Sequence, residues 1–103
     1  MQPFKGPYLY SEKIIKEWES TSIGVYYIGI KTSENQLKIF YIGKATGDGG
    51  VRERLLEHLS ETKWSDATHF GFHFFTGTDT EKIEEFEKKE ITKYKPKYNT
   101  MGV

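Results

Sequence analysis

The stretch that decides the fold is IGVYYIGI at residues 23–30, followed after a polar gap by LKIFYI at residues 37–42. Both runs are rich in β-branched and aromatic residues, and Thr32–Gln36 between them has the composition of a turn, so they predict an antiparallel hairpin. Apolar side chains occupy both alternating sets of positions: Val25 and Tyr27 on one face, Tyr26, Ile28 and Ile30 on the other. We therefore expect helices to cover both faces of the sheet.

The residues before the hairpin divide into an arm and a helix. Pro3, Gly6 and Pro7 predict an extended arm over residues 1–10, because proline and glycine oppose helix formation. Ser11 is a suitable N-cap for a short helix over about residues 12–19, in which apolar residues recur at helical spacing.

Three further elements are expected after the hairpin. Apolar positions at helical spacing predict a helix over about residues 51–62, and alternating phenylalanines predict a third strand over residues 69–75. Thr78–Glu81 has the pattern of a capping box, which predicts a last helix ending near Tyr94, before Pro96. The expected fold class is α/β (α+β), a three-stranded antiparallel sheet flanked by helices in the order αββαβα.

Composition excludes several kinds of protein. The 103 residues suit one domain, with residues 1–22 as an arm and short helix and residues 23–100 as the core. The absence of cysteine excludes disulfides, thiolate metal sites and a cysteine nucleophile. Because no apolar run approaches the roughly 18 residues of a membrane span and no signal-peptide pattern is present, we expect a soluble, cytoplasmic protein without membrane contacts.

Two carboxylates in the last predicted helix fall on its apolar side. With Ile83 at 0° and about 100° per residue, Glu87 falls near 40° and Glu90 near 340°, inside the apolar stripe. A carboxylate on a buried face is costly unless it has a partner. One interpretation is that both glutamates pair with Lys or Arg at a rim; the other is a metal-binding or acid–base carboxylate.

The middle helix has the opposite charge beside its apolar stripe. Arg54 and His58 lie one turn apart at the border of that stripe, so they can act on the same object. Each alone is more typical of a structural residue, Arg54 as a side chain that extends to solvent. Together with tyrosines and a carboxylate they suit phosphoryl chemistry, which needs a cation, a ligand for a hard metal and a group that activates water.

The glycine-rich segment 43–50 (GKATGDGG) precedes a helix, as phosphate-binding loops do. It matches neither the P-loop nor the dinucleotide-binding pattern, and the preceding hairpin differs from the strand–helix–strand unit in which those loops occur. A flexible turn between strand and helix is the preferred interpretation.

These residues resemble the motifs of the GIY-YIG endonuclease superfamily over about residues 22–100. The matching features, in order, are Gly24-Val25-Tyr26, Tyr41-Ile42-Gly43, Arg54 with His58 four residues later, a glutamate on the last helix and Asn99. The closing segment, residues 94–99, is similar to that of the nuclease domain of bacterial excision-repair endonucleases. In that pattern the metal-binding glutamate lies twelve residues before the asparagine, which selects Glu87 over Glu90.

The resemblance implies hydrolysis of DNA phosphodiesters with one divalent metal, Mg²⁺ or Mn²⁺, held by Glu87 and completed by water. It implies that Arg54 stabilises the charge that develops on the phosphate. Tyr26 would be the general base, with Tyr41 and His58 positioning water or phosphate. A phenol with a pKa near 10 needs a stabilised phenolate to act as a base at neutral pH.

Lys44 matches a lysine of the repair branch and would contact phosphate, with Arg52 beside it, and Asn99 would orient the site. Because the family usually takes its specificity from appended modules, the resemblance implies that target choice depends on a separate domain or partner. Double-strand cleavage by one active site would need a transient homodimer. Such proteins act in DNA repair or in mobile elements.

Two other functions remain open. The chain could keep the fold as a non-catalytic module that binds nucleic acid or protein, or it could be a structural domain that carries these tripeptides by coincidence. The net charge of zero averages an acidic segment, residues 79–90, with the lysines that follow it at 93, 95 and 97. DNA binding is therefore expected to be weak, salt-sensitive and confined to one basic edge.

Overall fold

The apolar hairpin lies at the centre of the fold. In the computed structural model, which describes residues 1–77 and 80–100, strand β2 spans Gly24–Ser33 and β3 spans Gln36–Ala45. The two strands are antiparallel and place Tyr26 opposite Gly43. Both extend beyond the expected ends, so Lys44 belongs to β3 and not to the loop that follows it.

The sheet has four strands, and the expectation of three was wrong. Strand β4 (His69–Phe74) pairs with β2, and β1 (Lys5–Leu9) pairs with β4, both antiparallel, in the order β1-β4-β2-β3. The N-terminal arm is extended as expected, but it is also the fourth strand. Pro7 is tolerated there because β1 is an edge strand and its register shifts between Lys5 and Tyr8.

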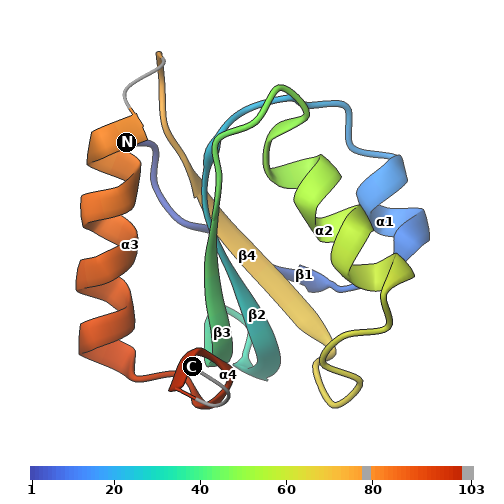
Figure 1. Ribbon diagram of the computed structural model, residues 1–103. Helices are drawn as coiled ribbons and strands as arrows, with labels where there is room; N and C mark the ends of the chain where they lie inside the picture. The colour runs from blue at the N-terminus through green and yellow to red at the C-terminus, as the bar shows by residue number, and fades with distance from the viewer. Residues whose placement is uncertain (78–79, 101–103) are drawn as a thin grey trace.

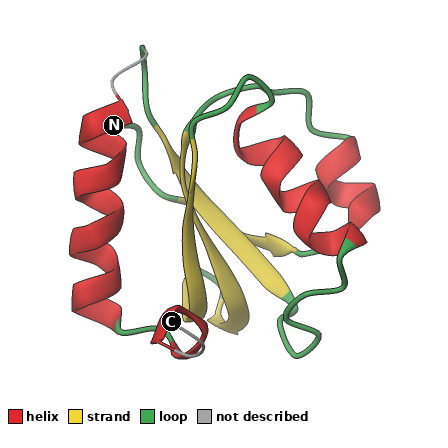
Figure 2. Ribbon diagram, in the orientation of Figure 1, coloured by secondary structure: helices red, strands yellow, loops and turns green. Residues whose placement is uncertain are grey.

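Helices cover both faces of the sheet, as the two apolar faces of the hairpin predicted. Helices α1 (Glu12–Lys16) and α2 (Gly50–Ser60) lie on one side and α3 (Thr80–Tyr94) on the other (Figure 1). A short helix, α4 (Lys97–Thr100), follows α3 beside the sheet (Figure 2). The observed order is therefore βαββαβαα, and the broader expectation of an α+β domain with an antiparallel sheet is confirmed.

Each face has its own hydrophobic core. Under α1 and α2 the core contains Tyr26, Ile28, Leu55 and the three phenylalanines of β4. The ring of Trp18 stacks on that of Phe72, with centroids 4.8 Å apart, and extends this core toward α1. Under α3 the core is smaller and consists of Val25, Tyr27, Ile42 and Ile83. Alternate residues of β2 therefore enter different cores.

The predicted helix signals have mixed outcomes. Ser11 caps α1 as expected, because its hydroxyl accepts a hydrogen bond from the Ile14 N–H at 3.2 Å, but α1 ends at Lys16 and not near residue 19. Thr78 and Asp79 of the expected capping box lie outside the described residues. No helix in the described part of the chain is both long and apolar enough to cross a membrane.

Candidate active site

The centre of the candidate site is a buried pair between β2 and α2. The Tyr26 hydroxyl and His58 Nε2 are 2.8 Å apart, and the two side chains are 0% and 2% exposed. Burial and the nearby charge of Arg54 lower the pKa of His58 to about 4, so its imidazole is neutral at pH 7. With Nε2 accepting the hydrogen bond from Tyr26, the ring proton lies on Nδ1, which has no hydrogen-bond partner among the described residues.

Gly43 makes room for the Tyr26 ring. The two residues are cross-strand partners, and a Cβ atom on Gly43 would overlap the end of the Tyr26 ring, including its hydroxyl. Because Tyr26 is buried and bonded to His58, its ring cannot easily move aside. The packing of Gly24-Val25-Tyr26 therefore depends sterically on that of Tyr41-Ile42-Gly43.

Arg54 lies between this buried pair and the surface. Its Nη1 donates to Glu57 Oε2 at 2.8 Å, and both side chains are close to half-exposed, so the ion pair contributes little stability. Although burial raises the pKa of Tyr26, the Arg54 guanidinium opposes that rise. Arg54 and Glu57 also line a cavity of about 110 Å³ beside the Gly47–Gly50 loop. Asp48 and Glu53 share this lining, so the loop does not have the charge of a phosphate-binding loop.

Tyr41 is the partly exposed phenol of the site. Its ring is 6.2 Å from that of Tyr26, and the Trp64 ring stacks on it at 4.4 Å. The Trp64 ring also packs edge-on against His58 at 4.5 Å. Burial and the nearby Glu87 carboxylate raise the pKa of Tyr41. Glu87 on α3 is therefore close enough to Tyr41 for their charges to interact, although α2 and α3 cover opposite faces.

The two glutamates on the apolar side of α3 have different environments. Glu90 Oε1 accepts a hydrogen bond from the Tyr27 hydroxyl at 2.6 Å, so its partner is a tyrosine and not the expected Lys or Arg. In the described part of the chain, Glu87 forms no hydrogen bond or ion pair with another side chain. Burial raises the pKa of the half-buried Glu87 carboxyl, and Lys44 opposes this. Of the two glutamates, Glu87 is thus the one whose carboxylate oxygens are available to bind a metal.

The predicted substrate-binding residues are placed differently from one another. Lys44 Nζ forms an ion pair with Glu84 at 3.0 Å, and Glu84 precedes Glu87 by almost one turn of α3. Arg52 points to the end of α1, where its Nε donates to the Ile15 carbonyl at 3.2 Å.

Asn99 is bonded through both polar atoms of its side-chain amide to the backbone of the sheet. Its side chain donates to the Ile42 carbonyl and accepts from the Ile42 N–H, both at 2.8 Å, on the open edge of β3. These two hydrogen bonds to the central residue of Tyr41-Ile42-Gly43 hold the strand in place. Asn99 therefore acts through β3, and Arg52 stabilises the contact between α1 and α2.

A hard divalent cation fits the donor set at Glu87. The carboxylate is half-buried and has no hydrogen-bond or ion-pair partner among the described residues, and bound Mg²⁺ commonly keeps several waters and one or two carboxylates. Among the described residues, no three His, Asp or Glu side chains group together as a metal site. The remaining ligands of such an ion would therefore be water and substrate oxygens.

Sequence reasoning missed two neighbours of the site. Glu57 follows Arg54 by three residues, a spacing that indicates an ion pair on a helix and could have identified it. Trp64 lies in the loop after α2 with a φ of 56°, where no periodicity indicates which way a side chain faces.

Comparison with protein-family models, with curated proteins and with solved structures gave no match for this chain.

Proposed function

We propose that this protein is a metal-dependent DNA endonuclease of the GIY-YIG type, using Mg²⁺ or Mn²⁺. The observation that carries the proposal is the convergence of five polar side chains around the centre of the hairpin: Tyr26 bonded to His58, Arg54 beside them, Tyr41 at the surface and Glu87 interacting with Tyr41. A cation, neutral donors and a carboxylate that can bind a metal are the parts that hydrolysis of a phosphodiester requires.

Arg54 would stabilise the phosphate as negative charge develops in the transition state. Its half-exposed side chain can reach a bound strand, while Glu57 holds it in place beforehand. Because Glu57 neutralises part of its charge, we infer that the guanidinium exchanges this partner for phosphate on binding. Such an exchange keeps an unpaired charge from being exposed in the free protein.

Tyr41 is the phenol that can contact water, since Tyr26 has no exposed surface. Burial raises the pKa of both phenols, so at neutral pH they act as hydrogen-bonding groups rather than as phenolate bases. We therefore assign Tyr41 to orient the attacking water and Tyr26 with His58 to position Tyr41. A divalent cation at Glu87 would supply the missing chemistry by acidifying its bound water and polarising the phosphate.

The deciding experiment is a cleavage panel with purified protein and supercoiled, nicked, flapped and four-way-junction DNA, with Mg²⁺, Mn²⁺ or EDTA. We expect metal-dependent cleavage of at least one substrate, abolished by Arg54→Ala and by Glu87→Ala. Nicked products would indicate one active site acting alone, whereas linear products from plasmid would indicate a transient dimer. The proposal fails if the wild-type protein cuts none of these DNAs, or if Glu87→Ala cuts equally well.

A non-catalytic nucleic-acid-binding module is the second candidate, favoured by the complete burial of Tyr26 and by the Arg54–Glu57 and Lys44–Glu84 ion pairs. In such a module these groups would stabilise the domain and perform no chemistry. It predicts DNA binding without turnover in any metal, and it predicts that Arg54→Ala changes affinity and stability only.

A further inference from the structure

A groove of about 450 Å³ lies between the C-terminal end of α3 and the first half of β3. It is lined by Leu37, Lys38, Ile39, Tyr94, Lys95 and Lys97. None of these six residues is acidic, and the groove is outside the group of residues assigned to catalysis. Its position combines three positive charges with an aromatic side chain at one edge of the sheet.

The charges and the ring are accessible. Lys38 and Lys95 are exposed, and neither forms an ion pair with another described residue. Tyr94 is 46% exposed, a large fraction for an aromatic side chain, with Lys93 Nζ 4.9 Å from its ring centroid. Lys97 is already bonded to Asp66 at 2.6 Å, so Lys38, Lys95 and Tyr94 are the groups that the groove offers to a ligand.

The backbone at Lys95 has a strained conformation. Lys95 follows the last residue of α3 with a φ of 46°, and its N–H donates to the Ile91 carbonyl at 2.8 Å. Glycine is the usual residue at this left-handed position after a helix, and a side chain there has a conformational cost. Lys95 therefore places its charge beside an exposed tyrosine at the edge of the groove.

We propose that this groove binds a single-stranded segment of nucleic acid, with phosphates at Lys38 and Lys95 and a base stacked on Tyr94. Exposed aromatic rings between lysines are typical of single-strand binding, because every base has a face that can stack, whereas bases in a duplex are already stacked. The inference rests on the proposed function for the identity of the ligand as DNA, and it specifies which part of the substrate is unpaired.

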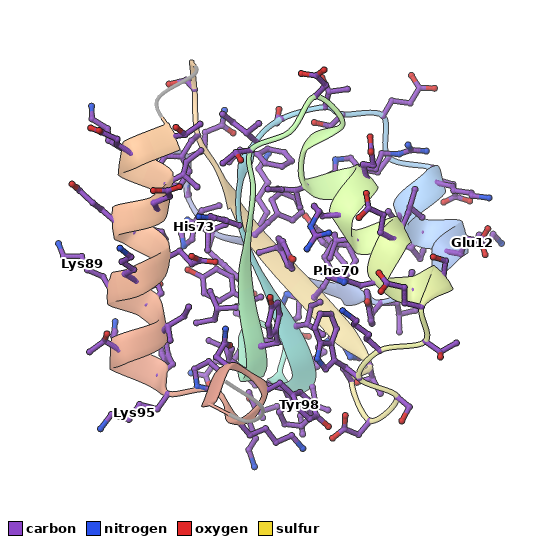
Figure 3. All side chains as sticks on the ribbon, in the orientation of Figure 1. Glu12, Phe70, His73, Lys89, Lys95 and Tyr98 are labelled. Carbon is purple, nitrogen blue, oxygen red and sulfur yellow. The ribbon has the colours of Figure 1, made fainter. Side chains whose placement is uncertain are left out.

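The distance to Glu87 fits this assignment. Tyr94 follows Glu87 by seven positions along α3. At 1.5 Å per residue they are roughly 10 Å apart along the helix, a distance that about three nucleotides span at the ~3.4 Å rise of stacked DNA and that fewer span in an extended single strand. A strand with its scissile phosphate near Glu87 would therefore enter the groove after a few nucleotides. Figure 3 shows Lys95 at the C-terminal end of α3 and Lys89 nearer the middle of the same helix.

The test measures binding without metal, by the fluorescence anisotropy of a labelled 20-nucleotide oligo-dT in EDTA between 50 and 200 mM salt. We expect Lys38→Ala/Lys95→Gly to bind about tenfold more weakly at 50 mM salt. The slope of log Kd against log salt should fall by about 1.4, because each lost phosphate contact on a single strand removes about 0.7. Lys95→Gly relieves the left-handed backbone, so the melting temperature should not fall.

Two controls separate this groove from general charge and from packing. Lys13→Ala/Lys89→Ala removes two exposed lysines elsewhere and should retain the wild-type slope. Tyr94→Phe should bind like the wild type, and Tyr94→Leu about tenfold more weakly, because only the ring is needed for stacking. A 20-base-pair duplex should bind more weakly than the single strand and should not distinguish the two Tyr94 variants.

The inference is overturned if the wild-type protein does not bind oligo-dT, if the groove double variant binds like its control, or if Tyr94→Leu matches Tyr94→Phe. Cleavage is measured separately, with metal. A protein that cuts no DNA but loses oligo-dT binding in the groove variants contradicts the nuclease proposal and supports the groove. A protein that cuts DNA, but whose groove variants bind oligo-dT normally, supports the nuclease proposal and contradicts the groove.

Discussion

Two neighbouring tyrosines on β2 have the same local arrangement on opposite faces of the sheet. Tyr26 is bonded to His58 of α2 at 2.8 Å, and Tyr27 donates to Glu90 of α3 at 2.6 Å. Each joins the sheet to the helix that covers its face. The pairs differ in their surroundings, because the first lies beside Arg54 and Tyr41, whereas the second has Phe4 and His73 as ring neighbours.

This difference shows that a polar pair between strand and helix is not by itself a site. Both pairs satisfy buried polar groups, which stabilises the fold. Burial and the bond to Glu90 raise the pKa of Tyr27, so that hydroxyl remains protonated at neutral pH. Only the Tyr26 side adds a cation that opposes the effect of burial, together with a second phenol that interacts with Glu87.

The largest expected effect separates the two glutamates. Glu87→Gln should reduce metal-dependent cleavage at least about 100-fold, because it removes the charged ligand of the metal. Glu90→Gln keeps a group that can accept the Tyr27 hydrogen bond and should cleave at nearly the wild-type rate. Initial rates on the best DNA substrate measure both. Equal losses in the two variants would show that the faces do not differ in function.

Gly43→Ala should disturb the packing around Tyr26 and not that around Tyr27. The added Cβ overlaps the buried Tyr26 ring, so we expect a loss of about 2–3 kcal/mol in the free energy of unfolding, measured in urea. Gly47→Ala is the matched control, since no atom lies within 4 Å of its added Cβ, and it should be close to neutral. A Gly43→Ala protein of wild-type stability would mean that Tyr26 has room to move.

The free energy of unfolding should depend on pH because folding lowers the pKa of His58. Its pKa is about 4 in the folded protein and about 6.5 when unfolded, so between these values the unfolded chain binds a proton that the folded protein does not. Stability is therefore lost as the pH falls through this window, by at most about 2 kcal/mol between pH 7 and pH 5. Urea unfolding at the two pH values should show a smaller loss for His58→Gln. Glu90→Gln should retain the wild-type loss, and an unchanged loss in His58→Gln would contradict the assignment.

The smallest effects compare the two hydroxyls directly. Tyr26→Phe and Tyr27→Phe should each lower the free energy of unfolding by about 1 kcal/mol, because each removes one hydrogen bond and leaves a partner unsatisfied. Only Tyr26→Phe should also slow cleavage, by about tenfold, since it releases His58 beside Tyr41. If Tyr27→Phe slowed cleavage equally, the two pairs would have equivalent roles.

Much of the fold was predictable because its signals are local. The apolar hairpin, the alternating phenylalanines of β4, the Ser11 cap and the end of α3 near Tyr94 each depend on the spacing of neighbouring residues. The pairing of β1 with β4 was not predictable in this way. An extended arm with proline and glycine has no periodicity, and only the open edge of β4 makes it a strand.

The candidate site divides in the same way. Helical spacing placed Arg54 beside His58, and it found two glutamates on the apolar side of α3. It could not show that Glu90 is bonded to Tyr27 while Glu87 has no hydrogen-bond or ion-pair partner in the part of the chain that the structure describes, because that depends on the side chains of β2 and β3. Arg52 and Asn99 also required the structure, since their partners are backbone atoms of distant elements.

The sequence by itself determined which residues enter each core, because the period-two alternation of β2 assigns Tyr26 and Tyr27 to opposite faces wherever the strand pairs. It also determined that Gly43 has no side chain, which the Tyr26 ring requires. Only the tertiary structure decided which polar groups are satisfied and which remain available. That depends on contacts between residues 32 and 63 positions apart, which no local pattern encodes.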